Sequence, residues 1–86
     1  MKNNKLYLEF EQLSERLGVR IVKGKGDFVG GPCKINGEAI IVINKTKPIE
    51  QRLKILAGSF LKYSLDEVYM IPALRAYIED VRLMDL

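Results

Sequence analysis

The strongest constraint on the fold is a strand that leads directly into a helix, within residues 40–63. Ile40 to Asn44 is a run of β-branched residues ending in asparagine, which is typical of a strand buried on both faces or central in a sheet. Residues 48–63 then repeat apolar side chains at a helical spacing, in Ile49, Leu53, Leu56 and Phe60. This pattern predicts a central helix with Pro48 in its first position. Because Gly58 costs such a helix about 1 kcal/mol relative to alanine, we expect another backbone to pack against it.

An N-terminal helix is predicted over residues 4–17. This segment repeats apolar residues at the same spacing as the central helix, with charged and polar residues between them. Asn3 or Asn4 can serve as its N-cap, because a side-chain oxygen there can accept a bond from a free backbone N–H. Gly18 suits the left-handed position that commonly follows a helix.

Three strands are predicted in the middle of the chain. Val19–Lys23 alternates apolar and basic residues, and Phe28–Ile35 reads as a strand interrupted by glycines and a proline. Asn36 and Gly37 then form a typical two-residue hairpin turn, which leads into Glu38–Asn44. We therefore expect a small antiparallel three-stranded meander.

Two further helices are predicted at the C-terminal end. Ser64 and Glu67 have the form of a capping box, which indicates a short helix through about Met70. Pro72 cannot continue that helix smoothly and suits the first position of a last one, ending near Leu83. The chain should thus form one α+β domain, residues 1–86, with two to three C-terminal helices packed on the sheet.

The sequence lacks histidine and has a single cysteine, Cys33. It therefore has neither the usual general base nor the residues for a zinc site or a histidine-dependent triad. We expect a protein that is not an enzyme and has no metal or cofactor. The lone thiol and the lack of a signal peptide or membrane span favour a cytoplasmic location. Cys33 is expected to be a buried or half-buried small side chain rather than a reactive thiol.

The net charge of +3 is concentrated in residues 19–47, which carry six basic and two acidic side chains. The six basic residues are Arg20, Lys23, Lys25, Lys34, Lys45 and Lys47. They form either an ordinary solvated surface or a surface for nucleic acid or another anionic ligand.

Two other patterns have both a functional and a structural interpretation. The glycine-rich stretch at residues 24–31 could hold a phosphate, but the motifs that do so lead into a helix, and here a hairpin follows. A flexible loop is the better interpretation. Tyr63, Tyr69 and Tyr77 could stack nucleic-acid bases, but they lie in the acidic third of the chain and are expected to pack between helices.

The succession of strand, hairpin, Ile-Asn strand end and helix containing Leu56 and Ala57 resembles the zincin metallopeptidases of the ImmA/IrrE type. In that family the helix continues with two histidines that hold zinc and a glutamate that activates water. Here Gly58, Ser59 and Lys62 stand at those three positions. The later Met-Ile-Pro step, ending at Pro72, is similar to a Met-Pro step in the family. The resemblance implies a reduced, ligand-less relative of this fold, to which no functional residue carries over.

These observations favour a small non-catalytic domain that acts as a protein-interaction or assembly module, including a possible homodimer. The alternative is a nucleic-acid or anionic-ligand binder that uses the basic residues around the central hairpin. Binding to a membrane is not expected.

Overall fold

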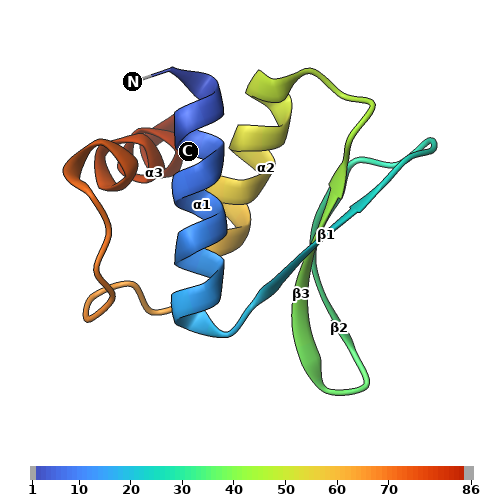
Figure 1. Cartoon of the computed structure of the whole chain (residues 1–86), viewed down its shortest axis with the longest axis horizontal. Helices are drawn as coiled ribbons and strands as arrows, with labels where there is room; N and C mark the ends of the chain where they lie inside the picture. Colours follow the sequence, from blue (N-terminus) through green and yellow to red (C-terminus); the bar gives the residue numbers. More distant parts are fainter. Residues whose placement is uncertain (1, 85–86) are drawn as a thin grey trace.

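The computed structural model describes residues 2–84, in which helices cover one face of a three-stranded sheet (Figure 1). The elements in chain order are α1 (Asn3–Leu17), β1 (Arg20–Gly24), β2 (Gly30–Ile35), β3 (Glu38–Asn44), α2 (Ile49–Phe60) and α3 (Pro72–Met84). Helices α1 and α2 contact the sheet, and α3 packs against both of them. The α+β class, the N-terminal helix, the three strands and the C-terminal helices are as predicted. Within residues 2–84, no helix has the length and apolar character to cross a membrane.

The pairing of the strands corrects the predicted antiparallel meander. The order across the sheet is β1-β3-β2, and β1 runs parallel to β3, whereas β2 is antiparallel to it. Strand β3 is central, as its apolar run indicated, and Ile41 lies opposite Ile21 of β1 and Pro32 of β2. Residues 25–29 connect β1 to β2 across the end of β3, so the two successive strands are separated by the width of one strand. Five residues can span that gap of about 10 Å.

Asn44 holds this crossing loop in place at the end of β3. The side chain is 1% exposed and makes four hydrogen bonds. Its Nδ2 donates to the carbonyl oxygens of Gly26 at 2.8 Å and Phe28 at 2.7 Å. Its Oδ1 accepts from the backbone N–H and the hydroxyl of Thr46, at 3.1 and 2.7 Å. One amide therefore satisfies polar groups on both the β1–β2 loop and the turn that enters α2.

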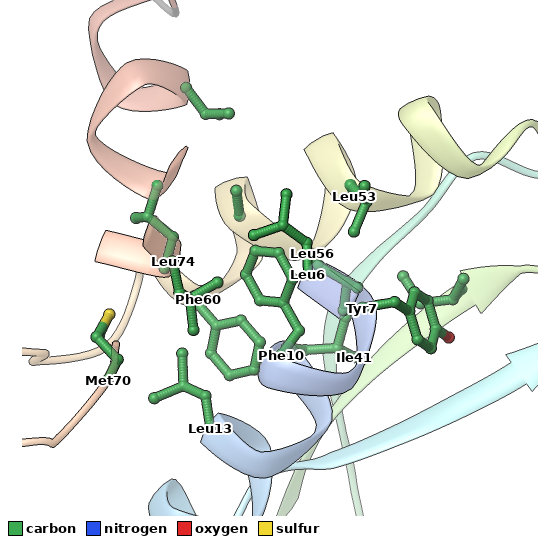
Figure 2. Packing of buried hydrophobic residues seen from close by; sticks show 14 of the residues in the cluster. Leu6, Tyr7, Phe10, Leu13, Ile41, Leu53, Leu56, Phe60, Met70 and Leu74 are labelled. Carbon is green, nitrogen blue, oxygen red and sulfur yellow. The ribbon is translucent and has the colours of Figure 1, made fainter. Parts of the chain in front are cut away.

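The hydrophobic core lies between α1, α2, α3 and the inner face of the sheet (Figure 2). Phe10 of α1 stacks on Phe60 of α2 with ring centroids 5.7 Å apart, and Tyr77 of α3 meets Phe10 edge-on at 6.1 Å. Ile41 supplies the sheet side of this core. The helical spacing of the sequence predicted these helix residues, because each apolar stripe faces the same interior.

The helix ends differ in part from expectation. Gly18 adopts the left-handed conformation with φ 70°, and its N–H donates to Glu15, which confirms the predicted C-terminal cap. The predicted asparagine N-cap is wrong, because α1 begins at Asn3 and its N-cap is Lys2, which makes no side-chain capping bond. Pro48 similarly precedes α2 as its N-cap residue and does not occupy the first helical position.

The short helix predicted from the capping box at Ser64 does not form. Residues 61–71 contain turns, and one backbone bond of 3.5 Å joins Val68 to Leu65. So short a segment cannot offset the cost of helix nucleation without tertiary support. Arginines hold the loop instead, since Arg75 donates to the carbonyl of Val68 at 3.2 Å and Arg16 to that of Tyr69 at 3.5 Å. Pro72 starts α3, as predicted.

Candidate functional site

Three ionisable side chains on α3 have shifted pKa values. No group of three cysteine, aspartate or glutamate side chains within this range could hold a metal ion. Burial raises the pKa of Tyr77 on α3. The hydrogen bond and charge of Arg82 lower the pKa of Glu79, but this pair lies on the surface of α3. Each of these pKa shifts therefore has an evident structural cause, burial for Tyr77 and a surface ion pair for Glu79.

Gly58, Ser59 and Lys62 line a cavity of about 520 Å³ between α2, strand β2 and the end of α3. The hydroxyl of Ser59 is buried and donates to the carbonyl of Ile55 at 2.7 Å, so it is already satisfied within the helix. The expectation that another backbone packs against Gly58 is wrong, because no atom beyond its chain neighbours and the backbone of its own helix lies within 4 Å of where its Cβ would be. The cavity is therefore open beside Gly58.

The structure brings together four of the six basic residues predicted as a surface. Lys23 and Lys25 lie at the carboxyl end of β1, and Lys45 and Lys47 follow the carboxyl end of the parallel strand β3. The N–H of Lys45 donates to the carbonyl of Gly24 at 2.8 Å, which joins the two strand ends. These four residues are therefore neighbours in the fold.

The other two basic residues lie toward the opposite end of the sheet. Arg20 begins β1 and forms an ion pair of 3.2 Å with Glu38, while Lys34 lies near the hairpin turn. The six residues therefore do not form one continuous basic track of the kind that follows a nucleic-acid backbone.

Tyr7 and Arg52, which no sequence pattern indicated, lie beside this group of four lysines. Tyr7 of α1 is 9% exposed, and its ring lies 5.2 Å from Lys23 Nζ and 5.9 Å from Arg52 Cζ, measured to the ring centroid. Arg52 is held in place, since its Nε donates to the carbonyl of Lys47 at 3.0 Å. We call Tyr7, Lys23, Lys47 and Arg52 the basic corner. Figure 2 shows the Tyr7 hydroxyl on the sheet side of the core, away from the stacked phenylalanines.

The basic corner could not be found by helical spacing alone. Tyr7 adjoins the apolar stripe of α1, so its sequence position indicates only partial burial. Arg52 lies beside the apolar stripe of α2, where a solvated arginine is the usual interpretation. They meet Lys23 only because α1 packs against both α2 and β1.

The sheet has an outer face that no helix covers among the described residues (Figure 1). Strand register assigns ten residues to this face, because directly opposed residues share a side. Its apolar part, which we call the outer patch, consists of Val22, Cys33, Ile35, Ile40 and Val42. Cys33 is exposed, which corrects the expectation of a buried or half-buried thiol.

The glycine-rich loop and the tyrosines have structural roles. The loop turns its Gly26 and Phe28 carbonyls onto Asn44, so it presents acceptors there and not the N–H groups that hold a phosphate. Tyr63 and Tyr77 pack against phenylalanines of the core. Only Tyr69 among the three is largely exposed, so they form no common stacking surface.

No family model matches this sequence, and no curated protein or solved structure is significantly similar to it.

Proposed function

We propose that this chain is a non-catalytic domain that associates with a second copy of itself through the outer face of its sheet. The observation that carries the proposal is the outer patch. It is an apolar surface on a sheet in which β1 pairs parallel to β3. Sheets with parallel pairs are usually covered on both faces, and here the helices cover one. Ile40 is buried, with only 1% of its surface exposed. Ile35 is 52% exposed and Cys33 is also exposed, so these two side chains leave apolar area for a partner to cover.

A second copy fits the charges that border this patch. Arg20 and Glu38 lie on the same outer face, 3.2 Å apart. A twofold axis can place Arg20 of each copy near Glu38 of the other, so the border is complementary to itself. An arrangement of two aligned sheets packed about 10 Å apart would bury the patch on both copies.

The area of the sheet limits the expected strength of association between the two copies. Three strands about 4.8 Å apart and a seven-residue central strand give roughly 300 Å² of flat area on each copy. This is less than the ~800 Å² per partner of a standard stable interface. We therefore expect a weak dimer whose population depends on concentration.

The test is light scattering coupled to size exclusion over a concentration series. The wild-type chain should shift from monomer toward dimer as concentration rises, and Cys33→Lys should remain monomeric because it places a charge in the outer patch. Leu8→Lys is the matched control, since Leu8 is 57% exposed on α1 and lies outside this face. It should associate as the wild type does.

The native thiol gives an independent readout. Cys33 should react more slowly with a thiol reagent at high protein concentration, because the second copy covers it. A wild-type chain that stays monomeric at millimolar concentration, with unchanged thiol reactivity, would contradict the proposal.

We also infer a non-catalytic domain related to the ImmA/IrrE-type metallopeptidases, acting in the cytoplasm. The absence of metal ligands at Gly58, Ser59 and Lys62 supports a framework without the chemistry of that family. Stoichiometric zinc in the purified protein, measured by elemental analysis, would refute this inference.

A further inference from the structure

The Tyr7 hydroxyl is a buried polar group that lacks a protein partner. Tyr7 is more than nine-tenths buried, and its hydroxyl oxygen makes no hydrogen bond to another residue of the described range. Burial removes this group from bulk water, so leaving it unpaired costs free energy. Such groups in native proteins call for an explanation, and a bound ion or water is one of those explanations.

Two cations lie against the same ring. Lys23 Nζ and Arg52 Cζ are 5.2 and 5.9 Å from the centroid of Tyr7. Arg52 is anchored through Nε to the Lys47 carbonyl, and its two terminal nitrogens make no hydrogen bond to other residues of the range 2–84. Its planar fork is therefore positioned in advance and free to bind, which lowers the entropy lost on binding.

One carboxylate competes for the site. Glu11 Oε2 lies 3.9 Å from Lys23 Nζ, a long contact between half-exposed side chains. A contact of this kind contributes little to stability. Lys23 can consequently exchange Glu11 for another anion beside the Tyr7 ring.

We propose that Tyr7, Lys23 and Arg52 bind the phosphate group of a small phosphorylated molecule. A phosphate offers several acceptor oxygens, which suit the arginine fork, the lysine ammonium and the tyrosine hydroxyl together. A nucleic-acid chain fits less well, because Arg20 is paired with Glu38 and lies with Lys34 toward the other end of the sheet. The site lies on the helix-covered side and is separate from the outer patch.

The test uses pyrophosphate and inorganic phosphate as probes, with the whole chain and matched ionic strength. Either probe should raise the melting temperature of the wild type relative to chloride and shift the Arg52 Nε–H NMR signal. Tyr7→Phe keeps the ring and removes only the hydroxyl, and Arg52→Gln removes the fork. Each should weaken the affinity about tenfold or more, the typical effect of losing a hydrogen bond to a charged group.

Two further variants separate a specific site from general charge. Glu11→Gln should strengthen binding, because it removes the competing carboxylate. Lys54→Gln removes one positive charge, as Arg52→Gln does, but Lys54 lies on the exposed side of α2. Its affinity should stay within about twofold of wild type, since distant surface charges are screened by salt.

Tyr7→Phe also provides a readout without ligand. Removing an unpaired buried hydroxyl should raise the stability of the free protein while it lowers the affinity for phosphate. The proposal is overturned if neither phosphate nor pyrophosphate stabilises the wild type at about 50 mM, or if Tyr7→Phe and Arg52→Gln leave the affinity unchanged. Tighter binding of a single-stranded oligonucleotide than of pyrophosphate, insensitive to Tyr7→Phe, would also overturn it in favour of a nucleic-acid surface.

Discussion

Replacement of Asn44 by alanine should be among the most damaging polar substitutions in the protein. The side chain is 1% exposed and joins two carbonyl groups of the β1–β2 loop to the turn before α2. This loop makes it possible for β3 to lie between β1 and β2. Loss of the amide therefore affects the connection on which the strand order depends.

The magnitude follows from the four hydrogen bonds of Asn44. A typical intramolecular hydrogen bond contributes about 1 kcal/mol net, so Asn44→Ala should lower the free energy of unfolding by about 3–4 kcal/mol. A domain of this length has a total stability of about 4–13 kcal/mol. The same loss should lower the melting temperature by more than about 12 °C.

Urea and thermal unfolding followed by circular dichroism would measure this effect. Thr46→Val is the matched control, because it removes the hydroxyl that donates to Asn44 Oδ1 and leaves the other three bonds. It should cost about 1 kcal/mol. A loss below about 1 kcal/mol for Asn44→Ala would refute the reasoning, because the loop would then be held by other contacts.

Asn44→Asp tests the donor role of the amide separately. One carboxylate oxygen would replace Nδ2 and face the carbonyl oxygens of Gly26 and Phe28. Burial and these acceptors raise the folded-state pKa of the new carboxyl above its unfolded value. Its favourable contribution is then present below the unfolded pKa and is lost as pH rises through the folded pKa. The variant should therefore be least destabilised in acid and most destabilised at neutral pH.

Three further outcomes are expected. Gly30→Ala should destabilise the fold by more than about 1 kcal/mol, because φ is 99° and the new Cβ would lie 2.6 Å from the carbonyl oxygen of Val42; urea unfolding measures this. Phe10→Ala should cost about 3–5 kcal/mol in the same assay, since this fully buried ring stacks on a second phenylalanine. The pKa of Glu79 should lie below its ordinary value and rise toward it in Arg82→Ala, followed by NMR titration; the stability from this pair is present above the unfolded pKa and is lost as pH falls through the folded one.

The sequence indicated some residues of the candidate sites and not others. The basic excess in residues 19–47 was visible in the sequence, and four of its six members are neighbours in the fold. Tyr7 and Arg52 were not selected, because each appeared as an ordinary member of an amphipathic helix. The outer patch was indicated by the apolar character of β3, but the residues that share it are known only from the register with β1 and β2.

The sequence by itself determined the helices with strong periodicity, the left-handed Gly18 and the turn at Asn36 and Gly37, where both residues have positive φ. These features depend on interactions within a few residues, so they can be recognised locally. Only the tertiary structure decided that β1 pairs parallel to β3, that residues 64–70 form no helix and that Tyr7 meets Lys23 and Arg52. The physical reason is that alternation along a strand specifies its faces, whereas its neighbour and direction depend on contacts between distant segments.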